Sequence, residues 1–307
     1  MTTQYLDQSF LGFQEYIDRQ ARSRLSDDDS TPLYAHPVDE WILRTLNAAP
    51  VKSVLDKSLD SVISVFMGQY LATSIFIDQK SFPDLFEVLS HCAETLGIPI
   101  PHAVTGDSPY LFNAFTAGTE EYSFIYITSG LCKYFSREEA CFVVGHECGH
   151  IAAKHMVYHT LVEVLTQMAS RYLGPLGRIL RQTAGIPLDA WARRSEITAD
   201  RAGLLCCGDI AVAERAFLRL VAGYADVEQV DIEDYLRRYK DMAEYHGAST
   251  WQQVFATHPL IPKRIEALRL FARSELYYDL SGKSRPADAA LLSRAELDRR
   301  VNQIVKP

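Results

Sequence analysis

Hydrophobic and polar residues alternate along this chain with two periods, and each period predicts a different kind of element. Residues 82–96 read FPDLFEVLSHCAETL, with apolar positions recurring every three or four residues. This period indicates an amphipathic helix, which we expect Ser81 to cap, Pro83 to open and Gly97 to end. The same period predicts further helices at 38–47, 51–67, 189–206, 211–224, 231–246 and 262–275.

Runs of β-branched and aromatic residues predict short strands at 74–77, near 102–105 and at 124–128, where FIYIT is the strongest signal. The segment NAFTAG (113–118) is rich in small and turn-forming residues, so we interpret it as a loop. The two kinds of element together predict an α+β fold that is mainly helical. Its small sheet, of about three strands, is expected to pack against one helix.

Composition adds bounds on size and organisation. The chain has 307 residues, of which 48% are hydrophobic, so it can bury a sizeable core. We divide it into an N-terminal extension at 1–40, a main domain at 41–275 and a charged helical tail at 276–307.

Charge and hydropathy exclude several classes of protein. The formal net charge of -8 argues against a general nucleic-acid binder, which usually has a basic surplus. No basic segment followed by an apolar run opens the chain, and no uninterrupted apolar run reaches the roughly 18 residues of a membrane span. We therefore expect a cytoplasmic protein with its six cysteines reduced. Peripheral contact with a membrane and the oligomeric state stay open.

The helix expected from about residue 137 to about 160 carries the chemistry. Ser136 and Glu139 form an S-x-x-E capping box at its start. His146 and His150 lie one turn apart on one face, so both rings can reach one metal ion. Glu147 lies between them and can serve as a general base, which makes the H-E-x-x-H pattern. An accidental match on a surface or core helix is the alternative; the capped helix after a strand favours one catalytic zinc ion per chain.

A catalytic zinc needs a third protein ligand. His155 lies five residues beyond His150, so we expect it to point elsewhere, and Met156 occupies the position where a third histidine of H-x-x-G-x-x-H would stand. The best candidate is Glu196, in RRSEITADRAG (193–203), on a second helix. Asp200, four residues on, can accept the spare N–H of a zinc-bound histidine. A solvated acidic face is the alternative for this pair.

Four segments together resemble the gluzincin metallopeptidases of the CAAX prenyl protease and HtpX type. They are NAFTAG (113–118), residues 125–155, residues 193–203 and THPLIPKRIEAL (257–268). Their order and approximate spacing match the family over about residues 74–272, and AHPVD (35–39) extends the likeness more weakly. The chain differs from the membrane members in lacking hydrophobic spans, which removes the argument for prenylated substrates.

The resemblance implies a zincin-like core and a role for each matching position. The implied zinc ligands are His146, His150 and Glu196. Glu147 would be the general base, and Asp200 the carboxylate that supports a ligand. Asn113 and His258 would lie near the metal, to bind substrate or stabilise an oxyanion; a turn residue and a loop residue are the alternatives.

The sequence therefore predicts a zinc-dependent metalloendopeptidase that hydrolyses peptide bonds in peptide or protein substrates. An extended substrate would add to a sheet edge at 124–128, where Tyr126 would contact it. The alternative is a zinc-binding, chaperone-like or regulatory module with latent or lost peptidase activity, its cleft covered by either terminal segment. A helical structural protein with an accidental motif would bind no metal.

Overall fold

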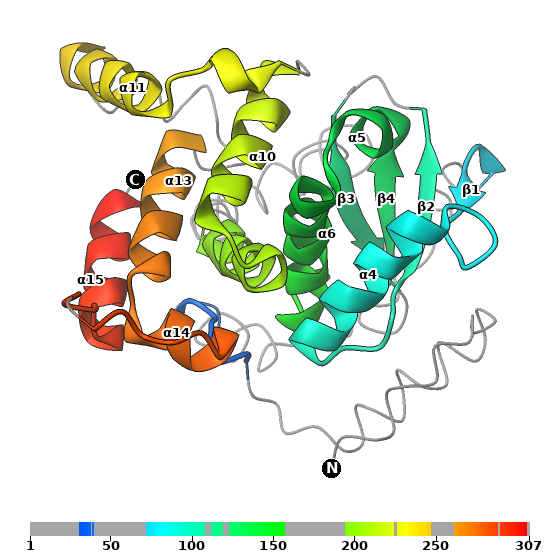
Figure 1. Ribbon diagram of the computed structural model, residues 1–307, viewed down its shortest axis with the longest axis horizontal. Helices are drawn as coiled ribbons and strands as arrows, with labels where there is room; N and C mark the ends of the chain where they lie inside the picture. Colours follow the sequence, from blue (N-terminus) through cyan, green and yellow to red (C-terminus); the bar gives the residue numbers. More distant parts are fainter. Residues whose placement is uncertain are drawn as a thin grey trace, which may run out of the picture.

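A four-stranded sheet and a larger set of helices make up the part of the chain that the computed structural model describes (Figure 1). The described residues are 31–37, 39, 72–107, 112–118, 123–156, 194–223, 226–246, 261–287 and 289–305. The mainly helical α+β class predicted from the sequence is confirmed. Within these residues, no helix combines the length and the apolar character needed to cross a bilayer.

The sheet has the order β1-β2-β4-β3. Its strands are β1 (Ile75–Phe76), β2 (His102–Gly106), β3 (Ala114–Gly118) and β4 (Ser123–Thr128). The pair β2 and β4 is parallel, and the two outer pairs are antiparallel.

Two predictions about the sheet are wrong. Segment 113–118 is strand β3 rather than a loop, because its pairing with β4 supplies the hydrogen bonds that its small residues do not signal locally. Strand β4 lies between β2 and β3 and is therefore no edge. Among the described strands, β3 takes the edge position on that side.

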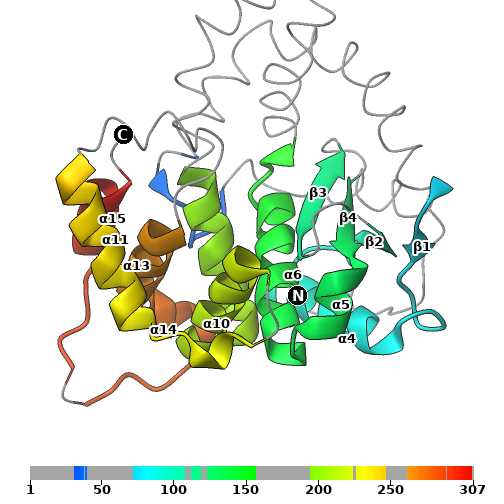
Figure 2. The same ribbon diagram turned by 90° about the horizontal axis from the view of Figure 1, so that it is seen from above.

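Side chains of β4 alternate between two environments. Ile125 and Ile127 belong to the apolar core on the helical side of the sheet. Tyr126 lies on the opposite face, where its ring stacks on Phe115 with centroids 5.1 Å apart. Helices α4 (Pro83–Leu96) and α6 (Arg137–Ala152) cover the core face of the sheet, as Figures 1 and 2 show.

Helix α4 begins and ends within a residue of its prediction. Gly97 ends it in the left-handed conformation, at φ 68°, where a residue without Cβ is least strained. Its N-terminal cap is Phe82, also left-handed, and not Ser81. The backbone N–H of Ser81 instead donates to the carboxylate of Asp78, 2.8 Å away, in the preceding turn.

Helix α6 is the central helix of the molecule, and the predicted capping box is confirmed. The hydroxyl of Ser136 accepts from the backbone N–H of Glu139, and the Glu139 carboxylate accepts from that of Ser136. Every residue from Glu139 to His150 is buried. The helix ends at Ala152, well short of the predicted 160, because Lys154 takes a positive φ of 57°.

A helical layer packs on the other side of α6 from the sheet (Figure 2). Its members are a helix at 194–207, α10 (Ile210–Ala222), α11 (Ile232–His246), α13 (Ile261–Ala272), α14 (Glu275–Ser281) and α15 (Arg294–Ile304). Two short elements, α5 (Ser129–Tyr134) and η2 (Val227–Gln229), complete the description. The helices predicted near 211–224, 231–246 and 262–275 are confirmed, whereas those at 38–47 and 51–67 fall outside the described residues, Asp39 apart.

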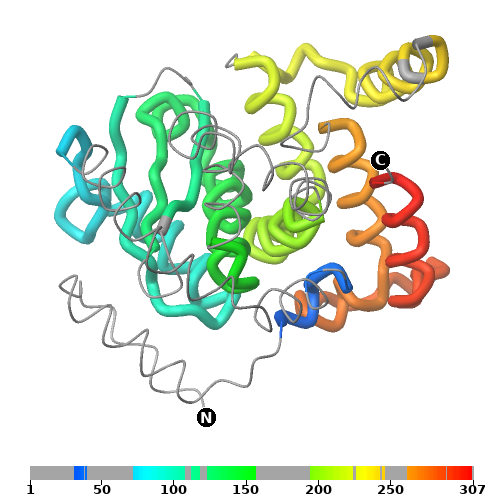
Figure 3. Tube along the Cα trace, turned by 180° about the vertical axis from the view of Figure 1, so that it is seen from behind, coloured from blue at the N-terminus to red at the C-terminus, as the bar shows by residue number. Residues whose placement is uncertain are grey.

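The described part of the N-terminus, residues 31–37 with Asp39, docks beside the C-terminal helices (Figure 3). We call it the N-terminal segment. Tyr34, His36 and Asp39 are buried in it. The guanidinium of Arg201 donates to the backbone carbonyl of Tyr34, 3.0 Å away, and so ties the segment to helix 194–207.

Candidate metal centre

Two glycines let α6 and helix 194–207 approach closely. A Cβ on Gly145 would lie 2.7 Å from the Cβ of Cys206, and one on Gly149 would lie 2.6 Å from the Cβ of Ala202. Both distances are shorter than real side chains allow. The close approach brings polar side chains on the facing surfaces of the two helices within reach of one another.

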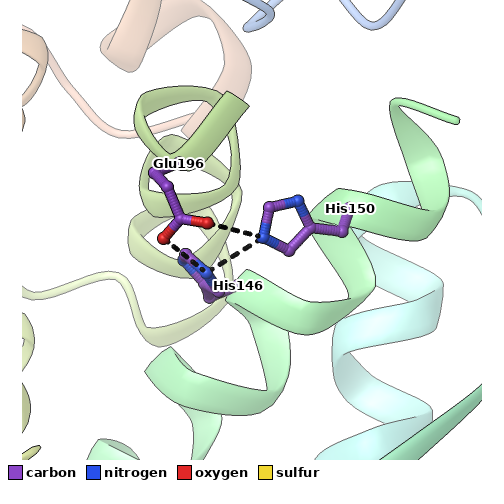
Figure 4. Close-up of side chains that lie close together, drawn as sticks. All are labelled: His146, His150 and Glu196. Carbon is purple, nitrogen blue, oxygen red and sulfur yellow. Dashed lines mark hydrogen bonds and ion pairs between the residues drawn. The ribbon is translucent and has the colours of Figure 1, made fainter. Parts of the chain in front are cut away.

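Three of these side chains converge in the buried space between the helices: His146 and His150 from α6, and Glu196 from the facing helix (Figure 4). One ligand atom from each lies within 4.8 Å of the others. Nε2 of His146 and Nε2 of His150 are 3.2 Å apart, and the Glu196 oxygens lie 3.7 and 3.5 Å from them. Among the described residues, no other such group of potential metal ligands occurs.

This donor set fits a zinc ion. Two imidazole nitrogens and one carboxylate oxygen face a common point, and three protein ligands leave the open fourth position of a catalytic site. Burial of all three side chains excludes bulk water that would otherwise solvate the donors. The sequence prediction of a shared site for these three residues therefore has a matching geometry, while the identity of the ion stays a prediction.

Each histidine of the centre uses its second ring nitrogen elsewhere. Nδ1 of His146 lies 2.9 Å from a carboxylate oxygen of Asp200. Burial would lower the pKa of His146, but the hydrogen bond and charge of Asp200 raise it above its ordinary value. Burial lowers the pKa of His150, which favours the neutral ring whose lone pair can bind a metal.

Arg264 of α13 holds the carboxylates of the centre, and sequence reasoning missed it. It donates to both oxygens of Asp200, at 2.8 and 2.5 Å, and lies 3.0 Å from Glu196. Its charge lowers the pKa of Asp200, although burial alone would raise it. A signal was available: Arg264 occupies an apolar position of its helix, four and seven residues before the core residues Leu268 and Phe271. A charge at such a position calls for a buried partner.

Glu147 points between α6 and the sheet, toward β3. The hydroxyl of Thr116 donates to its Oε2 at 2.5 Å and also contacts its backbone carbonyl at 3.3 Å. Sequence reasoning missed Thr116 because it assigned residues 113–118 to a loop. As a strand, that segment turns every second side chain toward α6.

The remaining predicted site residues that the structure describes are Asn113 and Tyr126. Asn113 precedes β3, and its backbone exchanges hydrogen bonds with Thr128. Tyr126 is buried on the face of the sheet away from α6, where its hydroxyl donates to the carbonyl of Asp107. The structure does not bring Tyr126 to the centre, so its predicted contact with substrate stays unsupported. His258 lies outside the described residues.

His155 is not one of the grouped ligand residues, as expected, but the expectation that its ring points away from them is wrong. It rested on a helix continuing past residue 155, whereas the chain turns after Ala152. The backbone N–H of His155 donates to the carbonyl of His150, and the two rings meet with their Nδ1 atoms 3.1 Å apart.

Comparison with known proteins identifies the family. The model of peptidase family M48 matches residues 79–272, more than half of the chain and the part that contains the centre. A similar protein is the plastoglobule-localized metallopeptidase 48, chloroplastic, of Arabidopsis thaliana, 26% identical over 260 residues that cover 80% of this chain and 74% of that protein. No solved structure matches significantly. The gluzincin resemblance predicted from the sequence is thus confirmed, and the chain belongs to peptidase family M48.

Proposed function

We propose that the protein is a zinc-dependent endopeptidase. The observation that carries this proposal is the convergence of His146, His150 and Glu196 in a chain of a peptidase family. When bound, zinc polarises the scissile carbonyl and lowers the pKa of a water to roughly 7. The remaining chemistry falls to the residues around it.

Glu147 is the proposed general base. It takes a proton from the attacking water and delivers it to the leaving amine. Thr116 donates to one carboxylate oxygen of Glu147, which fixes the side chain and leaves its other oxygen for the water. Arg264 and Asp200 keep Glu196 and His146 in place during this transfer.

The proposed substrate is an extended peptide that adds to β3. Among the described strands, β3 is the last on its side of the sheet, the position at which an extended peptide would add as a further strand. Thr116 lies on this strand and touches Glu147. A peptide paired with β3 would therefore run past the proposed base, which replaces the earlier prediction that it pairs with β4.

The variant Glu147→Gln tests the proposal. It removes the base but no ligand, so we expect a full zinc content with peptide cleavage reduced by about 10²–10⁴-fold. Zinc is measured by elemental analysis and cleavage with fluorescently quenched, unfolded casein. Glu138→Gln, an exposed position on the same helix, is the matched control and should cleave like the wild type.

A Glu147→Gln protein that cleaves at the wild-type rate would refute the proposed mechanism. A wild-type protein that binds one zinc ion but cleaves nothing would instead favour the zinc-binding module with latent or lost activity.

A further inference from the structure

A chain of buried contacts leads from His150 to the N-terminal segment. Nδ1 of His150 lies 3.1 Å from Nδ1 of His155. Nε2 of His155 lies 3.4 Å from Oδ2 of Asp39, a close electrostatic contact that falls outside hydrogen-bond geometry. His155 and Asp39 are fully buried. The contacts therefore join a ring of the metal centre to a carboxylate more than a hundred residues earlier in the chain.

The charge of Asp39 sets which ring nitrogen of His155 carries the hydrogen, and hence the direction of the His150–His155 hydrogen bond. An ionised carboxylate has no hydrogen to donate and attracts one, so its charge favours the tautomer of His155 with the hydrogen on Nε2, facing Asp39. A neutral His155 then has a lone pair on Nδ1, which accepts from Nδ1–H of His150. His150 is left with its lone pair on Nε2, the atom that faces Glu196 and His146.

Asp39 is itself held as an acceptor. The hydroxyl of Thr198 donates to its Oδ2 at 2.5 Å, and that hydroxyl accepts from the backbone N–H of His36 at 2.9 Å. Burial alone would raise the pKa of Asp39, but His155 and the hydrogen bond from Thr198 outweigh it and lower the pKa. Thr198 lies two residues after Glu196, so one helix supports both ends of the arrangement.

We propose that Asp39 and His155 are positioning residues that orient His150 for the metal. His146 receives this support directly from Asp200, whereas His150 receives it from Asp39 through His155. We call the arrangement the Asp39–His155 relay. Asp39 lies outside the matched residues 79–272, so this support is supplied by a part of the chain that the family model does not include. The inference rests on the proposed zinc site.

The test compares two substitutions of His155 in the full-length protein. His155→Phe keeps a ring beside His150 but removes the acceptor. His155→Asn removes the ring but retains a carbonyl oxygen that can accept from Nδ1–H of His150. Zinc affinity is measured by competition with a chromophoric chelator, and the cobalt-substituted proteins are compared by their d–d absorption. Ser136→Ala, which removes the cap of α6 without touching the relay, is the control for lost stability.

We expect His155→Phe to bind zinc about 10–100-fold more weakly and to change the cobalt spectrum. His155→Asn should stay within a few-fold of wild type, although it is the worse replacement for a buried ring and should unfold more easily. Asp39→Ala should weaken zinc binding in the wild-type background and have little further effect in His155→Phe, because its contact with His150 runs through that ring. Ser136→Ala should lose stability and keep its zinc affinity.

Wild-type affinity in His155→Phe, or additive effects of Asp39→Ala and His155→Phe, would overturn the relay. If His155→Phe does not fold, Asp39→Ala is compared with Ser136→Ala by itself, and equal affinities would overturn it as well. A wild-type protein without zinc would refute the proposed zinc site and the relay together. A zinc-binding protein that cleaves no peptide, with the expected order of affinities, would refute only the peptidase proposal.

Discussion

At the scale of single residues, the centre gathers more buried negative charge than its one guanidinium offsets. The centre holds three buried carboxylates, Glu147, Glu196 and Asp200, and one buried guanidinium, that of Arg264, which contacts Glu196 and Asp200. With both histidines neutral, as metal binding requires, the formal sum of three negative charges and one positive is -2, which a divalent cation balances. The positive charge of Arg264 therefore offsets part of the carboxylate repulsion that would otherwise destabilise the metal-free protein.

Replacing Arg264 with Met should destabilise the metal-free protein by about 3–5 kcal/mol, because Glu196 and Asp200 lose a buried partner. Unfolding by urea in the presence of a chelator measures this. Arg269→Met, on the same helix but with partly exposed partners, should cost less than about 1 kcal/mol. Equal losses in the two variants would contradict this account of Arg264.

At the scale of elements, the centre depends on how closely α6 approaches helix 194–207. The gap is set by Gly145 and Gly149 on one helix and by Ala202 and Cys206 on the other. Because the metal ligands come from both helices, a wider gap separates Glu196 from the two histidines. A substitution that changes the packing between these helices therefore also changes the distances between the metal ligands.

Gly149→Ala should destabilise the protein by about 1–3 kcal/mol and weaken zinc binding, since its new methyl group would overlap that of Ala202. Adding Ala202→Gly should restore part of both losses, because it removes the group that the new methyl meets. Chemical unfolding and chelator competition give the two quantities. A double variant as weak as Gly149→Ala would show that the backbone of Ala199, also close to this position, sets the limit.

The elements that were predictable from sequence are those with local signals. The capping box of α6 lies within four residues, and the amphipathic period of α4 repeats over several turns. Strand β3 was not predictable because Asn, Gly and small residues favour turns, and only pairing with β4 makes it a strand. The early end of α6 depends on the left-handed backbone of Lys154, a residue that gives no such signal.

The part of the candidate centre that was predictable from sequence is the part that a motif or the spacing along one helix face reveals. His146, His150, Glu147, Glu196 and Asp200 could be assigned from spacing together with the family resemblance. Thr116 and Asp39 could not, because each meets its partner through tertiary packing across a long stretch of chain. Arg264 could be recognised as a charge in need of a buried partner, but the identity of that partner could not be assigned. Their positions follow from which elements pack together, which spacing along one element does not reveal.

At the scale of the whole molecule, the centre joins parts of the chain that are far apart in sequence. The described residues around it come from the N-terminal segment, β3, α6, helix 194–207 and α13. A ligand that binds only the folded state raises the free energy of unfolding in proportion to the logarithm of its excess over the dissociation constant. Zinc should therefore stabilise the molecule globally.

At a hundredfold excess of zinc over its dissociation constant, we expect about 2.7 kcal/mol of added stability and a rise of several degrees in Tm. Glu196→Ala, which lacks one ligand, should show a much smaller rise at the same zinc concentration. Differential scanning calorimetry with and without chelator measures both. An equal rise in the two proteins would place the stabilising ion elsewhere.

The turn at Lys154 also provides a rule for reading other sequences. It places the ninth residue after the first histidine of H-E-x-x-H against the second histidine of the motif. A relative with a histidine at that place and a buried acid before its first strand would carry the same relay. One with an apolar residue there would have to orient its second ligand by other means. The spacing H-E-x-x-H-x-x-x-x-H thus sorts chains by how a ligand is supported, a distinction that the shorter motif does not make.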